Sequence, residues 1–276
     1  MRIARTIQEV RDAIARRPCG LVPTMGFLHE GHLSLIDAAR DAGAEFVVVS
    51  IFVNPRQFGP SEDFERYPRD ETRDAALLEQ RNVDLLFLPP VDVMYPPGAV
   101  TAVTTAGVAQ PLEGGRRPGH FDGVATVVLK LFNIVQPDLA VFGRKDAQQC
   151  AVIDRMVRDL DVPVRLVFAG TVREHDGLAM SSRNAYLSPD ERKRAPALYR
   201  ALRAGVEAVT HGIHDVAGVE HLMRKVIEET PGVDVDYVAL VDPLTFEAPA
   251  DFERKLLVAG AIRVGRTRLI DNMTIP

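Results

Sequence analysis

Several features that define specialised protein classes are missing from this sequence. Its 276 residues include only two cysteines, Cys19 and Cys150, which are far apart and match no metal-binding spacing. We expect them to be buried or idle thiols in a reducing compartment. No apolar stretch approaches the roughly 20 residues that cross a bilayer, and the first ten residues lack the apolar core of a signal peptide. We therefore expect a soluble, cytoplasmic protein with no membrane partner.

A long basic run is also absent. The net charge is −5, so we do not expect a nucleic acid as a partner. The chain contains no internal repeat and no low-complexity tract. Its apolar content of 46% and charged content of 26% are those of an ordinary globular protein that can bury a core. The length suits one large domain or two modest ones, at roughly 150 residues per domain.

Apolar strands and amphipathic helices alternate along the first 170 or so residues. The β-branched run Glu45–Phe52 is typical of a strand that is covered on both faces. The alternation predicts an α/β fold with a doubly wound parallel sheet. Residues 89–98 and 113–120 are expected to be loops, and residues 101–105 a short strand. Strands are predicted near residues 21–24, 45–52, 83–88, 139–142 and 164–169, and helices near residues 7–16, 31–43, 69–81, 121–135 and 147–160.

The pattern changes after Asn184. A helix is predicted from Ser188 to about residue 209. Its first residues match a helix start, with Ser188 at the cap, Pro189 in the first turn and Glu191 at the third position. We expect an N-terminal domain of residues 1–174 and a smaller α+β domain of residues 175–276, with the boundary near residues 174–187. Further elements of the second domain are a helix at 216–229, a strand at 233–241 and a hairpin of 255–264 with 267–270.

The stretch LVPTMGFLHEGHLSL, residues 21–35, organises the rest of the chain. It runs from a strand through a turn into a helix that begins near Gly31. His29 and His32 lie at that helix start, where unpaired N–H groups and the helix dipole attract anions. Two imidazoles there would suit a phosphate that gains negative charge during a reaction. An isolated pair at this spacing is more often a cap and a surface residue, but the strand and turn before it favour phosphate binding.

Polar side chains also follow two other predicted strands. Gln57, in SIFVNPRQF, offers an amide that could orient a hydroxy acid or could only tie down its own loop. Lys145, in FGRKDAQQ, precedes a helix and suits phosphate oxygens, although a lone lysine at such a place is usually solvated. Asp146 could cap that helix or accept a ribose hydroxyl, and Gln149 lies one turn further. Ligands of doubly wound sheets gather at these strand ends.

Two loops complete the set of candidate stretches. Arg116, Arg117 and His120 lie in EGGRRPGH, which is either a mobile cover over an anion or a solvated basic loop. Residues 180–183, Met-Ser-Ser-Arg, gather two hydroxyls and a guanidinium near the expected domain boundary. They could clamp a leaving pyrophosphate or form a polar linker. Residues 58–68 and 114–119 are candidates for a closing cover.

Five strings, PTMGFLHEGH, SIFVNPRQF, RRPGHFDGV, FGRKDAQQ and DGLAMSSRN, resemble the motifs of the pantothenate synthetase (pantoate–β-alanine ligase) family, in that family's order. The first contains the HIGH-type signature of adenylyl-transferring enzymes. The resemblance implies a Rossmann-like nucleotide domain, a smaller C-terminal domain and a homodimer. It further implies condensation of pantoate with β-alanine through a pantoyl-adenylate, with ATP as substrate, Mg²⁺ as cofactor, and AMP and pyrophosphate as products. The sequence does not identify the Mg²⁺ ligands.

The resemblance also implies roles for individual residues. His32 would be the acid that assists pyrophosphate departure, with His29 and Lys145 as further catalytic groups. Gln57 and Gln149 would hold pantoate, and Gln57 would also lie near β-alanine. The implied ATP contacts are Met25, Gly26, Phe27, Leu28, His29, Glu30, Gly31, His32, Gly143, Arg144, Lys145, Asp146, Val172, Met180, Ser181, Ser182 and Arg183. The family usually has small residues in place of Phe27 and His175, a difference that concerns the shape of the pocket edge.

Three other functions share some of these features. A nucleotidylyltransferase that adenylates a phosphate-bearing substrate would need a more basic acceptor pocket than Gln57 and Gln149 provide. An enzyme like an aminoacyl-tRNA synthetase is disfavoured by the acidic charge and by the lack of an RNA-binding extension. A non-catalytic ATP sensor is disfavoured by the intact His29, His32, Lys145 and Ser182.

Overall fold

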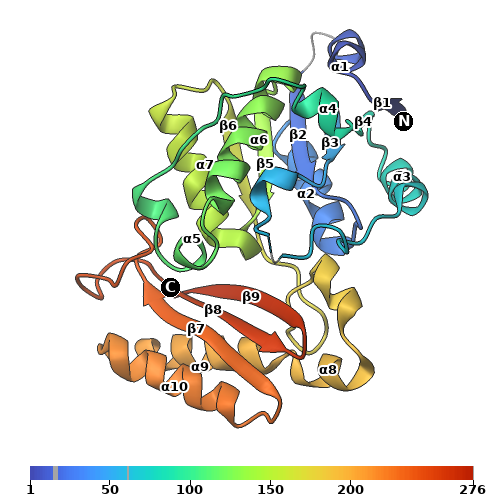
Figure 1. Cartoon of the computed structure of the whole chain (residues 1–276). Helices are drawn as coiled ribbons and strands as arrows, with labels where there is room; N and C mark the ends of the chain where they lie inside the picture. The colour runs from blue at the N-terminus through green and yellow to red at the C-terminus, as the bar shows by residue number, and fades with distance from the viewer. Residues whose placement is uncertain (15–17, 61, 276) are drawn as a thin grey trace.

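The parallel sheet predicted from the sequence forms the upper half of the molecule in Figure 1. The computed structural model describes residues 1–14, 18–60 and 62–275. Within these ranges the sheet has six strands in the order β1-β4-β3-β2-β5-β6, and every neighbouring pair is parallel. The strands are β1 (Arg2–Ala4), β2 (Cys19–Thr24), β3 (Phe46–Ile51), β4 (Leu85–Phe87), β5 (Leu139–Gly143) and β6 (Arg165–Ala169).

Helices cover both faces of this sheet. Along β3, Phe46 and Val48 are buried in one apolar cluster, whereas Val47 and Val49 are buried in another. Successive side chains of a strand point to opposite faces, so the continuous β-branched run serves both cores. The first cluster includes α1 (Ile7–Ala13), α6 (His120–Val135) and α7 (Ala147–Asp159), and the second includes α2 (Glu30–Asp41) and α3 (Glu71–Gln80).

The strand order places one crevice at the centre of the sheet. β2 pairs with β3 on one side and with β5 on the other. The chain therefore leaves the carboxyl ends of β2 and β5 in opposite directions, which is the topological switch point of a doubly wound fold. Residues 25–32 follow β2 and residues 144–146 follow β5. The candidate histidines and Lys145 are thus brought to the same edge by topology.

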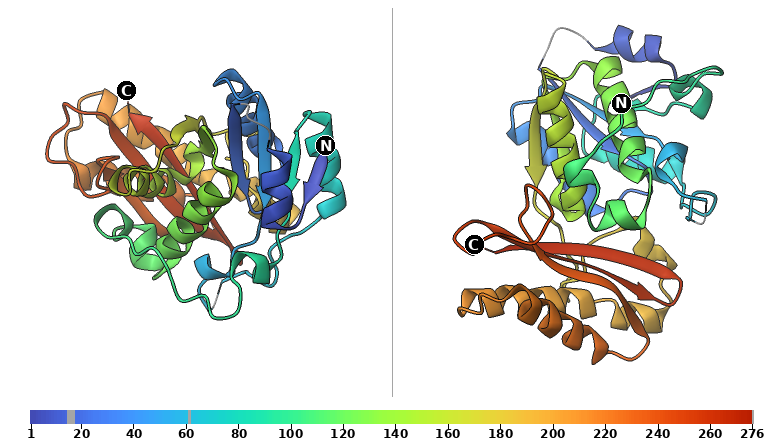
Figure 2. Two further views of the ribbon diagram at one scale, coloured as in Figure 1. Left: turned by 90° about the horizontal axis from the view of Figure 1, so that it is seen from above. Right: turned by 60° about the vertical axis from the view of Figure 1, so that its left-hand side comes forward.

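A three-stranded antiparallel sheet lies below, as Figure 1 and the right panel of Figure 2 show. Its strands are β7 (Val233–Val241), β8 (Leu256–Val264) and β9 (Thr267–Ile275), in that order. One face packs on α9 (Ala197–Thr210) and α10 (Val216–Glu228) around the buried Leu202, Met223 and Val258. The other face, with Tyr237 and Ala259, packs toward α7. The domain boundary near residues 174–187 stays a prediction.

The structure corrects several predicted elements. Residues 101–105 do not form a strand, because their backbone binds side chains of α6 instead: Val103 N–H donates to Thr126 Oγ1 at 2.9 Å and Thr105 N–H to Asp122 Oδ1 at 2.8 Å. The expected loops contain the short helices α4 (Val91–Met94) and α5 (Glu113–Arg116).

The helix expected from Ser188 to residue 209 is two helices. α8 (Pro189–Arg194) ends before Pro196, and α9 begins after it, because proline lacks the N–H that would continue the hydrogen-bond ladder. β1 was not expected, and β9 runs on to Ile275. The predicted end of the first helix, at residue 16, lies outside the described residues.

Candidate active site

The turn between β2 and α2 has a constrained backbone. Gly26 has φ 85° and Phe27 has φ 50°, and a Cβ on Gly26 would lie 2.8 Å from Ile51 Cγ2. Only glycine fits this position without strain. The buried carboxylate of Asp74 on α3 accepts hydrogen bonds from Phe27 N–H at 2.6 Å and Leu28 N–H at 2.8 Å. Asp74 therefore fixes the turn that leads to the histidines, a role that the sequence pattern did not indicate.

His29 and His32 face each other at the start of α2, with ring centroids 4.0 Å apart. Burial and then the positive charge of Lys145 lower the pKa of His29 to about 4. Burial and then the neighbouring His29 lower the pKa of His32 well below its usual value. Both rings are therefore neutral near pH 7. Among the described residues, the buried Nδ1 of His29 has no hydrogen-bond partner.

The tautomer of His32 follows from one hydrogen bond. The backbone N–H of His29 donates to His32 Nδ1 at 3.4 Å. Since Nδ1 accepts, the ring proton of neutral His32 lies on Nε2. Neutral His32 is thus a hydrogen-bond donor through Nε2–H, at the positive end of a helix dipole.

Gln57 is both tied to its neighbours and directed toward the cavity beside the histidines. Asn54 Nδ2 donates to Gln57 Oε1 and to Gly123 O, each at 3.1 Å. Asn54 is itself held by the Tyr95 hydroxyl, which donates to Asn54 Oδ1 at 2.9 Å. Because Asn54 takes the amide oxygen, the Gln57 NH₂ group points the other way, 3.3 Å from Met25 Sδ. The two interpretations of Gln57 are therefore compatible.

Lys145 lies in a single 3-10 turn, Arg144–Asp146, between β5 and α7. Its Nζ is 3.5 Å from Asp146 Oδ1. In the first turn of α7, the side chains of two adjacent glutamines point in different directions. Gln148 is buried, where its side chain donates to Val108 O and Pro111 O, whereas Gln149 faces the cavity.

The segment 180–183 is joined to the turn after β2. Met180 N–H donates to Val172 O at 3.0 Å, and Ser182 Oγ donates to Phe27 O at 3.2 Å. Arg183 forms a two-point ion pair with Asp63, with Nε–Oδ2 3.0 Å and Nη2–Oδ1 2.9 Å. Arg183, whose guanidinium was expected to hold a pyrophosphate, is therefore already bound to the Asp63 carboxylate in this structure.

A second ion pair joins the two loops that were expected to close over the site. Arg117 contacts both oxygens of Glu62 at 2.7 Å. Arg117 also donates to His120 Nε2 at 2.9 Å, and His120 Nδ1–H donates to Gln57 O at 2.8 Å. Burial and then Arg117 lower the pKa of His120 to about 4. Burial opposes the charged form of Glu62, yet its bonds with Arg117 hold its pKa below the usual value.

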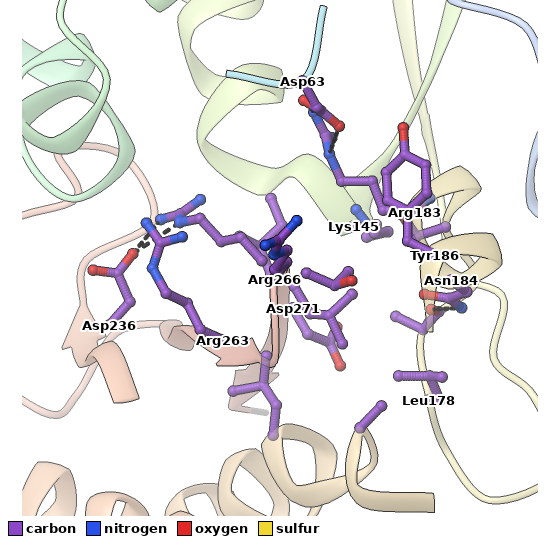
Figure 3. A pocket seen from close by; sticks show the side chains of 18 of the residues that line it. Asp63, Lys145, Leu178, Arg183, Asn184, Tyr186, Asp236, Arg263, Arg266 and Asp271 are labelled. Atoms are coloured by element: carbon purple, nitrogen blue, oxygen red, sulfur yellow. Dashed lines mark hydrogen bonds and ion pairs between the residues drawn. The ribbon is translucent and has the colours of Figure 1, made fainter. Parts of the chain in front are cut away.

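Two cavities meet at these side chains. The outer one, of about 700 Å³, lies between this edge of the parallel sheet and the β8–β9 hairpin, as Figure 3 shows with Lys145 and Arg183 opposite Arg263, Arg266 and Asp271. The inner one, of about 210 Å³, is lined by these candidate residues: Met25, His29, Gly31, His32, Gln57, Gly143, Lys145, Asp146, Gln149, Val172, Met180, Ser181, Ser182 and Arg183.

Five implied ATP contacts do not line either cavity. Leu28 is buried in the apolar core, Glu30 is exposed and pairs with Arg81 at 2.9 Å, and the side chain of Arg144 donates to Phe168 O. The other two, Gly26 and Phe27, form the strained turn, and the Phe27 ring lies beside the Arg73 guanidinium, 5.1 Å from ring centroid to Cζ. Any contact of these five with ATP stays a prediction.

Comparison with known proteins decides the family. The sequence model of the Pantoate-beta-alanine ligase family matches residues 2–274. The chain belongs to this family. Among pantoate–β-alanine ligases, the pantothenate synthetase of Gluconobacter oxydans (strain 621H) is 52% identical to it over 277 residues, which are 100% of each chain. That of Thermotoga neapolitana is 52% identical over 99% of each.

Solved structures agree. The crystal structure of pantoate–β-alanine ligase (pantothenate synthetase) from Thermus thermophilus matches with a TM-score of 0.95, 51% identity and 99% of each chain covered. The ligase of Francisella tularensis, complexed with β-γ ATP and β-alanine, matches with a TM-score of 0.82, 32% identity, and 99% and 97% of the two chains covered. The predicted family and α/β fold are confirmed.

Two findings bear on partners. Among the described residues, no helix is long and apolar enough to span a membrane. In the same part of the chain, no group of three or more His, Cys, Asp or Glu side chains could hold a metal ion.

Proposed function

We propose that the protein condenses pantoate with β-alanine to pantothenate, with ATP converted to AMP and pyrophosphate. One observation carries the proposal: the paired histidines, Gln57, Lys145 and segment 180–183 line one cavity at the switch point of the sheet. Membership in the pantoate–β-alanine ligase family supports it. So does the similarity to the Francisella ligase, which was solved with β-γ ATP and β-alanine.

In the first step, a carboxylate oxygen of pantoate attacks the α-phosphorus of ATP and pyrophosphate leaves. Gln57 orients pantoate through its NH₂ group, since Asn54 occupies the amide oxygen. Gln149 is the second orienting amide, because its side chain lines the same cavity. No side-chain nucleophile is needed, and most of the rate enhancement comes from positioning and from stabilising charge.

Charge that builds up on the leaving pyrophosphate is met by His32, His29 and Lys145. The lowered pKa of His32 favours a neutral ring at pH 7, so His32 acts through its Nε2–H as a hydrogen-bond donor to phosphate oxygen. Lys145 supplies a full positive charge beside it. Mg²⁺, when bound, adds further charge stabilisation on the phosphate oxygens, and ATP and water would provide most of its ligands, with Asp146 as the carboxylate beside Lys145.

In the second step, the β-alanine amine attacks the carbonyl carbon of pantoyl-adenylate and AMP leaves. Water would hydrolyse this intermediate, so the site must be closed during its lifetime. The Arg117–Glu62 ion pair supports closure, because it joins the loop after β3 to the loop before α6. We also propose the cytoplasm as location and a homodimer as assembly, from the family resemblance.

Mass spectrometry of products, with substrates omitted one at a time, tests the proposal. We expect pantothenate and AMP only when pantoate, β-alanine and ATP are all present. A nucleotidylyltransferase would instead give a product that keeps the AMP group, and a sensor would give no product. Either of those results would refute the proposed function.

A further inference from the structure

The last strand of the chain lies against the turn that carries Lys145. Asn272, on β9, is buried, and its Nδ2 donates to Arg144 O at 2.9 Å and to Lys145 O at 2.8 Å. The two partners are 127 positions away from it in sequence or further. One amide group of the C-terminal sheet thus satisfies two carbonyls of a turn at the inner cavity.

These two bonds fix the backbone on both sides of Lys145. The carbonyl of Arg144 belongs to the peptide plane before Lys145, and the carbonyl of Lys145 belongs to the plane after it. Holding both planes fixes φ and ψ of Lys145, and hence the direction in which its side chain leaves the backbone. Across each trans peptide the N–H group lies opposite the C=O, so the N–H groups of Lys145 and Asp146 point away from Asn272.

Asn272 is itself rigidly held. Its backbone N–H donates to Asp271 Oδ1 at 2.8 Å, and Arg173 binds the Asp271 carboxylate at 2.5 and 3.1 Å. Arg173 also donates to Asn272 O at 3.2 Å. Asp271 is buried and borders the outer cavity opposite Lys145 in Figure 3. Asp271 and Asn272 of β9 therefore hold both the lysine turn and Arg173, which forms an isolated β-bridge with Ala179 shortly before Ser181 and Ser182.

We propose that Asn272 is a positioning residue for Lys145 in the adenylation step, an inference that rests on the proposed function. Asn272 acts only through the backbone of residues 144 and 145. Its contribution belongs to the step in which Lys145 meets the triphosphate and not to the attack of the amine. A role limited to stability would affect both steps alike.

The test is to measure the two half-reactions of the full chain separately. Asn272→Leu keeps the approximate size and removes both hydrogen bonds. Pantoate-dependent exchange between ATP and labelled pyrophosphate should slow by about 10- to 100-fold, the usual range for a residue that orients a functional group, with a raised KM for ATP. Aminolysis of supplied pantoyl-adenylate by β-alanine should proceed at the wild-type rate. Thr274→Val, at an exposed position of the same strand, should leave both rates unchanged.

A double-mutant comparison isolates the coupling. If Asn272 acts through Lys145, the variant with Asn272→Leu and Lys145→Ala should exchange no more slowly than Lys145→Ala alone. The inference would be overturned if the exchange rate of the double variant fell by the product of the two single losses. It would also be overturned if Asn272→Leu slowed both half-reactions equally, or if it exchanged at the wild-type rate. Should Asn272→Leu fail to fold, Asn272→Asp answers the same question, because it keeps the size and removes the donor. If the wild-type protein shows no pantoate-dependent exchange, the proposed function itself fails.

Discussion

Two groups of residues that border the site differ in charge. The tip group, His29, His32 and Gln57, is neutral, since burial lowers the pKa of both histidines. The rim group consists of paired ions, Arg183 with Asp63 and Arg117 with Glu62. The tip group can bind a negatively charged phosphate without breaking an ion pair. An arginine of the rim group must first release its carboxylate partner. The difference suggests that the tip group serves the chemical step and the rim group serves binding and closure.

The largest effect should come from the tip group. His32→Ala removes the Nε2–H donor, and we expect adenylation to slow by about 10²-fold or more, the usual scale for a group that assists a leaving group. Pantoate-dependent ATP–pyrophosphate exchange measures this rate, and circular dichroism checks that the fold is retained. A rate near that of the wild type would remove His32 from the mechanism and leave the tip group without a catalytic role.

Gln57→Leu should come next. The substitution removes the NH₂ group that faces the cavity, and it leaves Asn54 Nδ2 without one of its two acceptors. We expect KM for pantoate to rise about 10-fold, as for the loss of a hydrogen bond of about 1.4 kcal/mol, while KM for ATP changes little. Steady-state kinetics with each substrate varied would show this. Equal changes in both KM values would mean that Gln57 only ties down its loop.

The neutral state of the tip group predicts a pH dependence of stability. An unfolded histidine binds a proton below about pH 6.5, but folded His29 does so only below about pH 4. Unfolding therefore takes up a proton between about pH 4 and pH 6.5. This contribution to the free energy of unfolding is fully present above about pH 6.5 and is lost as the pH drops toward 4. The slope is at most about 1.4 kcal/mol per pH unit for each such histidine.

Urea unfolding between pH 7.5 and 5 measures this slope. His29→Gln should weaken the pH dependence of the free energy of unfolding, since it removes one group that takes up a proton on unfolding. The buried His32 and His120 stay in place. If the wild type and His29→Gln lose stability in parallel, the low pKa of His29 is wrong and the tip group is not neutral by burial.

The smallest effect should come from the rim group. Asp63→Ala frees Arg183 from its ion pair, so a polyphosphate need not displace a carboxylate. We expect KM for ATP to fall by a few-fold, because partly exposed ion pairs contribute only about 1 kcal/mol or less. Asp63→Asn serves as the size-matched control and should shift KM the same way. A raised KM would show that Asp63 holds Arg183 in its binding position.

The sequence could predict what depends on neighbours along the chain. The alternation of strands and helices, the helix start at His29 and the bounds of β7 all follow from spacing within about ten residues. Gln57, Lys145 and Gln149 could be placed at the cavity because parallel strands bring their carboxyl ends to one edge. Pro196 is a sequence signal for the break between α8 and α9, and the prediction of one helix from Ser188 to residue 209 did not use it.

What could not be predicted depends on distant pairs. Asp74 looks like any charged residue of an exposed helix, and only the fold turns it toward the turn at Phe27. Arg183 and Asp63 are 120 positions apart, so local spacing carries no sign that they pair. The bonds from Asn272 to residues 144 and 145 span the two sheets and appear only once the β8–β9 hairpin is placed against α7.

The most direct test of the account is ATP–pyrophosphate exchange with pantoate present and β-alanine absent. If the neutral tip group activates the pantoate carboxylate by adenylation before the amine is needed, labelled pyrophosphate will enter ATP in the wild type and nearly cease to do so in His32→Ala. Exchange that requires β-alanine, or that is unaffected by His32→Ala, would contradict the central claim.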